Sequence, residues 1–181
     1  WLAAEAMLRR PAPVELGERI SAPVAAAGTV AAGAGPGLVN RVLLPVDASD
    51  SAARAVEYVI AMRRHHPAPE TMDIHLMNVQ REGSGDVSRF VAKGSLQEYH
   101  RERSVQALER ARKILDDAGV TYGVHMLVGK PWEVITSYAG IQRCDQIVMG
   151  TRGLGSYTGG LLGSIAQGVA QHSPVPVLLV K

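Results

Sequence analysis

The sequence contains a single cysteine, Cys144, among its 181 residues. One cysteine excludes an intramolecular disulfide framework and any zinc site with four cysteine ligands. Aromatic side chains make up only 4% of the chain, so few rings are available to stack on nucleic-acid bases. No run of about 18 apolar residues occurs, and the sequence therefore predicts no membrane-spanning helix.

Charges of the two signs almost balance, with 19 lysines and arginines against 17 aspartates and glutamates and a net charge of +2. Such a small surplus does not favour binding to nucleic acid through neutralised phosphates. The N-terminal stretch also lacks the continuous apolar segment of a secretory signal, because charged residues interrupt it. We therefore expect a cytoplasmic protein with neither a nucleic-acid nor a membrane partner.

The composition of the chain changes near residue 38. Residues 21–37 (SAPVAAAGTVAAGAGPG) consist almost entirely of alanine, glycine, proline and valine, which leaves few large side chains to bury. We interpret residues 1–38 as an N-terminal extension with an Ala/Gly-rich linker, and residues 39–181 as one globular domain. Two interpretations of the extension remain open: a tail that docks loosely or on a partner chain, and a disordered segment.

From residue 40 onward, short apolar segments alternate with segments of helical periodicity. Ser49 or Asp50 is placed to cap the first helix, Gly119 to end the second and Pro131 to begin the third. The pattern predicts strands at residues 41–46, 73–79, 121–128, 145–149 and 175–180, with helices between them. This order predicts an α/β fold with a single doubly wound, five-stranded, parallel-type sheet and helices on both faces, in the Rossmann-like manner. Ligands of such folds bind beyond the carboxyl ends of the strands, where the strand order reverses.

A set of glycines follows the fourth predicted strand. Gly150 and Gly153 are expected to let the backbone approach a ligand closely and to adopt positive φ. Gly163 and Ser164 open the last helix, where free N–H groups and the helix dipole favour an anion, and the Ser164 hydroxyl is placed to donate to a phosphate or to cap the helix. Any one of these glycines is also an ordinary loop residue, but the set indicates a phosphate site. The P-loop and dinucleotide glycine motifs are both missing from the sequence.

At these residues the sequence resembles the universal stress protein family, over essentially all of residues 40–181. Nucleotide-binding members carry a glycine, two residues, a glycine, nine residues, and then a glycine followed by serine or threonine. Further typical features are the end of the first strand, the residue before the glycines, and the turn into the third helix. The matching residues here are Gly150, Gly153, Gly163 and Ser164, with Met149, Pro45-Val46-Asp47, Ser49 and Gly129-Lys130-Pro131.

The resemblance implies the universal stress protein fold and a site for ATP or a related adenine nucleotide. In that site Asp47 would accept hydrogen bonds from the ribose hydroxyls, and Val79 would meet the adenine. The other interpretations are a turn or capping role for Asp47 and core burial for Val79, while Arg152 either reaches a phosphate or is solvated. The complete predicted nucleotide-binding set is Pro45, Val46, Asp47, Val79, Met149, Gly150, Gly153, Gly163, Ser164 and Ile165.

No pattern in the sequence predicts a catalytic residue or a metal ligand. The six histidines are scattered and no pair has the i, i+4 spacing of a helical zinc motif, and no nucleophile elbow occurs. Mg²⁺ would be bound, if at all, through the nucleotide phosphates and water. Residues 80–94, beside the expected adenine position, fit either a mobile lid or an ordinary exposed connection. We expect Cys144 to be a small buried residue.

These observations favour an ATP-binding stress-response protein whose conformation or choice of partner depends on the nucleotide. The resemblance also implies a homodimer paired through the C-terminal strand, which would cover an exposed sheet edge. Three alternatives stay open: a slow ATPase or autokinase, a sensor of AMP or a cyclic adenine nucleotide, and an interaction module with an empty site. The sequence does not identify a protein partner.

Overall fold

The computed structural model describes residues 14–15, 38–81, 93–154 and 162–181. Its sheet contains the five parallel strands that the sequence predicts, in the order β4-β3-β2-β5-β6. The strand order reverses between β2 and β5, because the chain first builds outward to β3 and β4 and then adds β5 and β6 on the other side of β2. The parallel strands are β2 (Arg41–Pro45), β3 (Asp73–Gln80), β4 (Gly123–Val128), β5 (Gln146–Gly150) and β6 (Val177–Val180).

A sixth strand, β1 (Val14–Glu15), was not predicted and pairs antiparallel with β4 at the edge of the sheet. Val14 lies opposite Val128, and Glu15 lies opposite Leu127. Two residues are too few to show the alternation from which a strand is predicted. The segment interpreted as an extension therefore contributes at least one short strand to the sheet of this chain.

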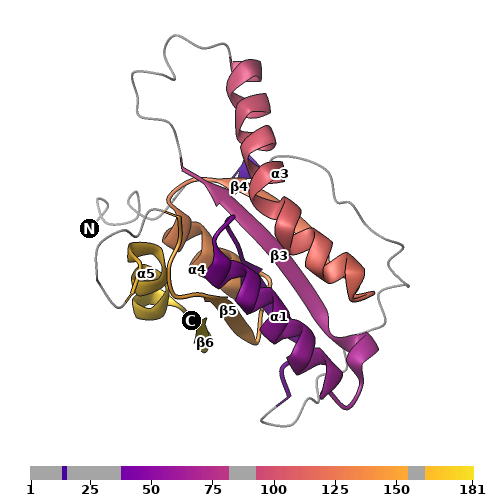
Figure 1. Ribbon diagram of the computed structural model, residues 1–181. Helices are drawn as coiled ribbons and strands as arrows, with labels where there is room; N and C mark the ends of the chain where they lie inside the picture. Colours follow the sequence, from indigo (N-terminus) through magenta and orange to yellow (C-terminus); the bar gives the residue numbers. More distant parts are fainter. Residues whose placement is uncertain (1–13, 16–37, 82–92, 155–161) are drawn as a thin grey trace, which may run out of the picture.

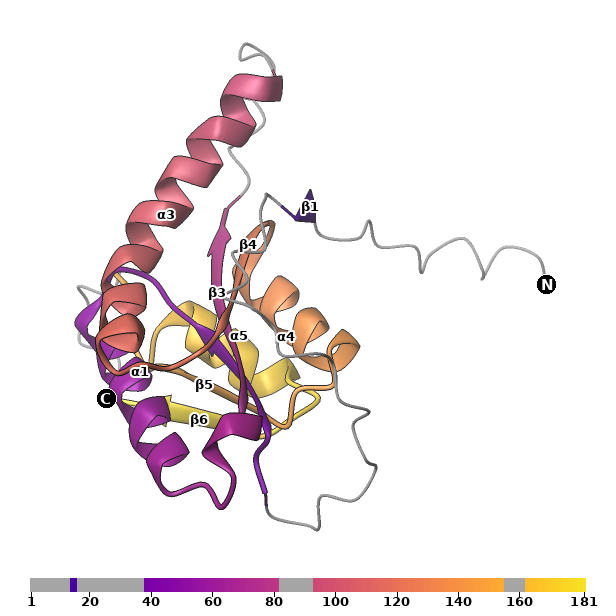
Figure 2. The same ribbon diagram turned by 90° about the vertical axis from the view of Figure 1, so that its right-hand side faces the viewer.

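In the part of the chain that the structure describes, four α-helices cover the two faces of the sheet, as predicted (Figure 1). Figure 2 shows α1 and α3 on one face and α4 and α5 on the other, with the first turns of α3 projecting beyond the sheet. None of the helices in the described ranges is long and apolar enough to cross a membrane. Their bounds are α1 (Asp50–Arg64), α3 (Lys93–Asp117), α4 (Pro131–Ile141) and α5 (Ser164–His172), with a short 3₁₀ helix, η1 (Pro69–Thr71).

Helix α1 begins five residues after the carboxyl end of the central strand β2. Ser49 is its N-cap, and the Ser49 hydroxyl accepts a hydrogen bond from the backbone N–H of Ala52 at 3.2 Å. This bond satisfies one of the donors that every helix start leaves open. Of the two predicted candidates for the cap, Ser49 and Asp50, the cap is therefore Ser49. It lies two residues after Asp47.

Two apolar cores lie on opposite sides of the sheet, because successive strand residues point to opposite faces. In β2, Leu44 packs in the core beneath α1 and α3, whereas Leu43 packs in the core beneath α4 and α5. The same alternation in β3 places Leu76 in the first core and Met77 in the second. The strands whose carboxyl ends meet at one edge, β2, β3 and β5, are therefore packed on both faces.

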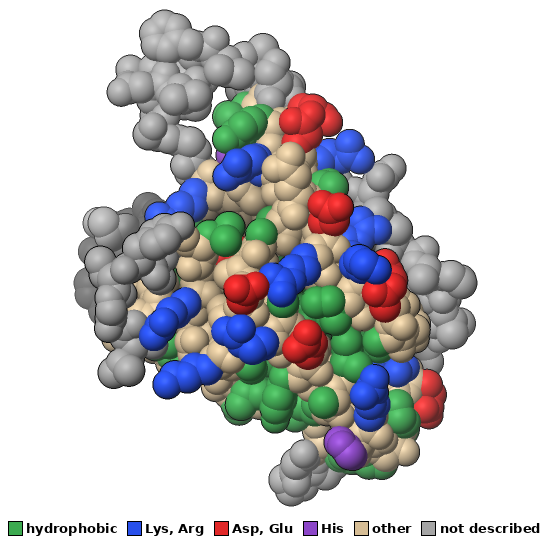
Figure 3. Space-filling model, in the orientation of Figure 1, with side chains coloured by type: hydrophobic (Ala, Val, Ile, Leu, Met, Phe, Trp, Pro, Cys, Tyr) green, Lys and Arg blue, Asp and Glu red, His purple; other side chains and the backbone are tan. Residues whose placement is uncertain are grey.

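Basic and acidic side chains are interspersed on the face formed by α1 and α3 (Figure 3). Several of them are paired on the helix surfaces, including Lys113 with Asp117 at 2.9 Å and Arg110 with Asp50 at 2.5 Å. Exposed pairs of this kind contribute little to stability, with a typical range of about 0–1 kcal/mol.

Candidate functional site

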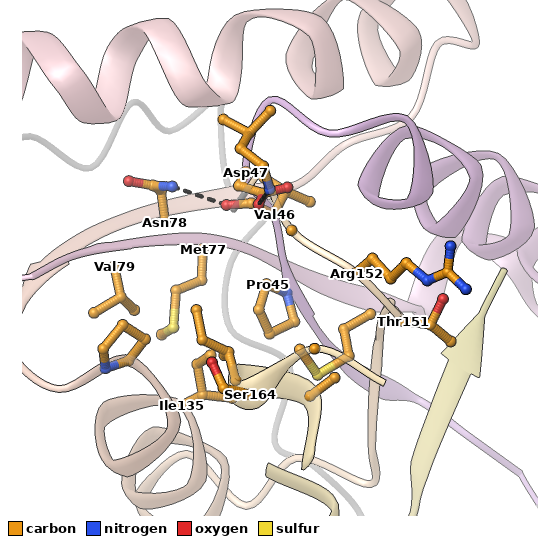
Figure 4. Close-up of a pocket in the computed structure, with 18 of the residues that line it drawn as sticks. Pro45, Val46, Asp47, Met77, Asn78, Val79, Ile135, Thr151, Arg152 and Ser164 are labelled. Atoms are coloured by element: carbon orange, nitrogen blue, oxygen red, sulfur yellow. Dashed lines mark hydrogen bonds between the residues drawn. The ribbon is translucent and has the colours of Figure 1, made fainter. Parts of the chain in front are cut away.

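A pocket of about 500 Å³ opens at the carboxyl ends of β2, β3 and β5, where the strand order reverses (Figure 4). The sequence argument expected a ligand site at this place in the fold. The walls come from the ends of these strands and from the first turns of α4 and α5. All ten predicted site residues line this one pocket: Pro45, Val46, Asp47, Val79, Met149, Gly150, Gly153, Gly163, Ser164 and Ile165.

Asp47 follows β2 and binds two backbone segments with its carboxylate. Its Oδ1 accepts a hydrogen bond from the N–H of Ser49 at 3.0 Å, which closes a local turn before α1. Its Oδ2 accepts a hydrogen bond from the N–H of Leu154 at 3.1 Å, in the loop after β5. The side chain is partly exposed and lines the pocket. The turn role considered for Asp47 is present, and unused lone pairs remain on both oxygens because each accepts one bond.

Two hydroxyl groups at the start of α1 hold the loop after β5. The Ser49 hydroxyl donates to the backbone carbonyl of Arg152 at 3.2 Å, and the Ser51 hydroxyl donates to the same oxygen. Ser51 is only 5% exposed, so its bond is made away from solvent. Together with the Asp47–Leu154 bond, these contacts fix residues 152–154 against the first turn of α1.

Gly150 and Gly153 are required by close packing rather than by unusual backbone angles. A Cβ added at Gly150 would lie 2.4 Å from Ser51 Oγ, and one added at Gly153 would lie 2.6 Å from Asp47 Oδ2. The prediction that these glycines adopt positive φ is wrong, because among the described glycines only Gly119 and Gly129 do so. The tight fit of the loop against Asp47 and Ser51 already explains the absence of side chains at both positions.

The start of α5 forms the floor of the pocket. Gly163 is the N-cap and Ser164 is the first helical residue, so the predicted helix start is confirmed while the capping role considered for Ser164 is not found. The Gly163 N–H donates to the Thr151 carbonyl at 2.8 Å, which ties the helix start to the loop after β5. Ser164 is exposed and lines the pocket, and the dipole of α5 favours an anion here.

One wall of the pocket is apolar. In Figure 4, Met77 and Val79 lie on the side of β3 that faces Ile135 of α4, and Asn78 lies on the opposite side. Val79 packs against the core beneath α4 and α5 but is only partly buried, so the two interpretations of Val79, core residue and pocket wall, both describe its position.

Two cationic side chains, Arg81 and Arg152, also line the pocket, and both are exposed.

Several lining residues were not predicted from the sequence, among them Met77, Asn78, Arg81, Ile135 and Thr151. Ile135 and Met77 belong to ordinary apolar patterns, so nothing in the sequence separates them from core residues. Asn78 did carry a signal, because it follows Ile74 and Leu76 at every second position of the 73–80 strand, on a face where an apolar residue would be expected. Arg152 was considered as a phosphate contact or a solvated side chain; it is exposed at the rim of the pocket.

Other reactive side chains lie away from the pocket. Cys144 is 4% exposed, as expected, and burial raises the pKa of its thiol to about 11. His75 and His125 stack with ring centroids 5.1 Å apart, a contact between strands that sequence spacing does not reveal. In the portion of the chain that the structure describes, no group of three or more His, Cys, Asp or Glu residues could hold a metal ion. Residues 80–94 were considered as a mobile lid or an ordinary exposed connection, and most of this segment, residues 82–92, lies outside the described residues.

Fold and pocket together define a doubly wound α/β domain whose cavity lies at the switch point of the sheet. A model of the universal stress protein family matches residues 39–181. The chain is 33% identical over 153 residues to the universal stress protein MJ0531 of Methanocaldococcus jannaschii, covering 81% of this chain and 85% of that protein. This chain therefore belongs to the universal stress protein family, which confirms the resemblance noted in its sequence.

Solved structures agree with this assignment. That of the hypothetical protein MJ0577, also from Methanocaldococcus jannaschii, has a TM-score of 0.66 at 29% identity and covers 79% of this chain and 96% of its own. That of a universal stress protein in complex with cAMP has a TM-score of 0.58 at 24% identity and covers 79% of this chain and 97% of its own. The second similarity shows a shared fold.

Proposed function

We propose that this protein binds an adenine nucleotide, ATP in the first place, in the pocket at the switch point, and acts as a nucleotide-dependent regulatory protein in a stress response. The observation that carries the proposal is the convergence of all ten predicted nucleotide-binding residues on one pocket. These residues come from four separate parts of the sequence and meet at the carboxyl ends of β2, β3 and β5, where ligands of doubly wound folds bind.

The distribution of chemistry in the pocket supports a single orientation of the nucleotide. The adenine would lie against the apolar wall near Val79, and the ribose hydroxyls would donate to Asp47. The phosphates would lie along Gly150 and Gly153 and reach the N-terminus of α5 at Ser164. Mg²⁺ would be carried on the phosphates and completed by water.

A solved protein of the same fold bears on the identity of the nucleotide. The universal stress protein solved with cAMP has this fold, which supports an adenine nucleotide as the class of ligand. ATP is the proposed ligand here because the glycine set and the start of α5 line the same pocket as Asp47, so that a triphosphate would extend from the ribose site toward the helix N-terminus.

We further propose that the protein works as a homodimer paired through β6. Strand β6 forms one edge of the sheet, and each of its four residues, Val177–Val180, is only partly buried in the single chain. An apolar edge strand of this kind favours pairing with another strand. Pairing with β6 of a second copy would cover both edges symmetrically.

The function is tested by competition between unlabelled nucleotides and a fluorescent ATP analogue on the full chain freed of nucleotide. We expect ATP to compete most strongly, followed by ADP, AMP and cAMP, with GTP weakest. Asp47→Ala should weaken ATP binding by at least about tenfold, since hydrogen bonds to a charged group contribute about 1.5–3 kcal/mol.

The matched control is Asp117→Ala, which removes an exposed carboxylate that pairs with Lys113 far from the pocket and should leave ATP binding unchanged. Tighter binding of AMP or cAMP than of ATP would replace ATP as the ligand. Equal loss of affinity in both variants would contradict the proposed site.

A further inference from the structure

Asn78 is a buried amide at the wall of the pocket, near the end of β3. It is only 4% exposed and points to the face of the sheet opposite Met77 and Val79 (Figure 4). Burying an amide is unfavourable unless its polar atoms are hydrogen-bonded. The contacts of Asn78 therefore indicate what an apolar residue at this position could not supply.

Both ends of the Asn78 amide are hydrogen-bonded. Its Nδ2 donates to the backbone carbonyl of Val46 at 2.8 Å, and its Oδ1 accepts from Gln80 Nε2 at 2.7 Å. The Val46 carbonyl can only accept, so the Asn78 amide group beside it must be the nitrogen, and the Asn78 oxygen then faces Gln80. Asn78 thus holds the carbonyl of Val46 in one direction.

The carbonyl of Val46 belongs to the peptide group that also contains the nitrogen of Asp47. Strand β2 ends at Pro45, so this peptide lies just beyond the regular strand pairing. The Val46 N–H donates to the Met77 carbonyl at 2.8 Å, and Asn78 binds the carbonyl on the other side of the same residue. With both polar groups of Val46 bound to β3, the peptide plane from which Asp47 projects cannot rotate freely.

We propose that Asn78 is a positioning residue for ribose recognition: its amide fixes the Val46–Asp47 peptide and so presents the Asp47 carboxylate to the ribose hydroxyls. This inference rests on the proposed function, in which Asp47 binds the ribose. Asn78 does not itself contact the ligand in this role. Its contribution is to hold a binding group in the bound geometry beforehand, which raises affinity by lowering the cost of ordering.

The test compares the affinities of ATP and 2′,3′-dideoxy-ATP, which lacks both ribose hydroxyls. The full wild-type chain should bind ATP about ten- to a hundredfold more tightly than the dideoxy analogue, as expected for hydrogen bonds to a carboxylate. In Asn78→Leu this ratio should fall to within about threefold, because ATP binding weakens while dideoxy-ATP binding changes little. Asn78→Ser, whose side chain is too short to reach the Val46 carbonyl, should behave in the same way if the leucine variant does not fold.

Gln80→Ala serves as the matched control, since it removes a neighbouring side-chain hydrogen bond but leaves the bond from Asn78 to Val46. The wild-type ratio should be retained in this variant. An equal loss of affinity for both nucleotides in the Asn78 variants, or no loss for either, would overturn the positioning role while nucleotide binding stands. Failure of the wild-type chain to bind either nucleotide would overturn the proposed function and this inference with it.

Discussion

The Asp47 carboxylate accepts a hydrogen bond from the backbone N–H of Leu154 at 3.1 Å, between residues 107 positions apart in the sequence. This bond joins the end of β2 to the loop after β5, on the two sides of the switch point. The same carboxylate is the proposed acceptor for the ribose hydroxyls. Ribose binding and the position of the loop after β5 therefore depend on one side chain, that of Asp47.

Gly153→Ala should weaken ATP binding about tenfold or more. The added Cβ would lie 2.6 Å from Asp47 Oδ2, so either the carboxylate or the loop must move. Affinity is measured with the fluorescent ATP analogue, on variants shown to be folded by circular dichroism. Gly140→Ala is the control, because its Cβ meets only Pro174 at an ordinary 3.5 Å. Equal ATP affinity of the Gly153 and Gly140 variants would contradict the close fit of the loop against Asp47.

Two glycine-to-alanine changes in helices should shift stability in opposite directions. A Cβ at Gly168 of α5 would lie 2.7 Å from the Trp132 ring, and overpacking of this kind costs about 1–3 kcal/mol. A Cβ at Gly140 of α4 is free of clashes, so the better helix propensity of alanine should add up to about 1 kcal/mol. Urea unfolding of both variants gives the two values. Destabilisation of the same size in both variants would contradict the close approach of Gly168 to Trp132.

Cys144 should react slowly with thiol reagents at pH 8 in the folded protein. Burial raises the pKa of its thiol from 9.0 to about 11, which lowers the thiolate fraction at this pH by about a hundredfold. The folded state also loses stability as pH rises from about 9 to 11, because the unfolded thiol ionises first. The rate of reaction of Cys144 with Ellman's reagent at pH 8, with and without urea, checks the slow reaction of the folded protein. Equal rates in the folded and unfolded protein would contradict the burial of Cys144 beside α4.

Asp73 should contribute to stability at neutral pH and lose that contribution in acid. Its hydrogen bond with His75, together with Arg41, lowers the pKa of the carboxyl from 3.8 to about 2. A lowered pKa in the folded state means that the stabilisation is present above pH 3.8 and is lost as pH falls through about 2. The difference in urea midpoint between wild type and Asp73→Asn should therefore be largest near pH 5 and shrink toward pH 2. A difference that is constant over this range would contradict the ion-pair account.

The order of strands and helices could be predicted because each element carries its own periodicity and its own end signals. Strand β2, the Ser49 cap and the glycine that ends α3 are all visible within a few residues of sequence. Four of the ten proposed site residues could be selected because the spacing of Gly150, Gly153, Gly163 and Ser164 is distinctive, and the other six followed from the resemblance to the universal stress protein family that this spacing carries. The convergence of these residues on one pocket follows from the parallel order of the strands.

Contacts between distant segments could not be predicted in this way. The prediction of positive φ at Gly150 and Gly153 was wrong. Glycine is required at these positions because Ser51 and Asp47 lie close by, and only the folded chain reveals this proximity. Strand β1 is too short to show a pattern. The role of Asn78 likewise depends on a carbonyl 32 residues away, which no pattern within the strand reveals.

The central claim is tested most directly by isothermal titration of ATP into the full chain after removal of any bound nucleotide. The account predicts saturable binding of one ATP per chain, reduced at least about tenfold by Asp47→Ala and unchanged by Asp117→Ala. Absence of saturable ATP binding, or binding that Asp47→Ala leaves intact, would contradict the claim that this pocket is an adenine-nucleotide site.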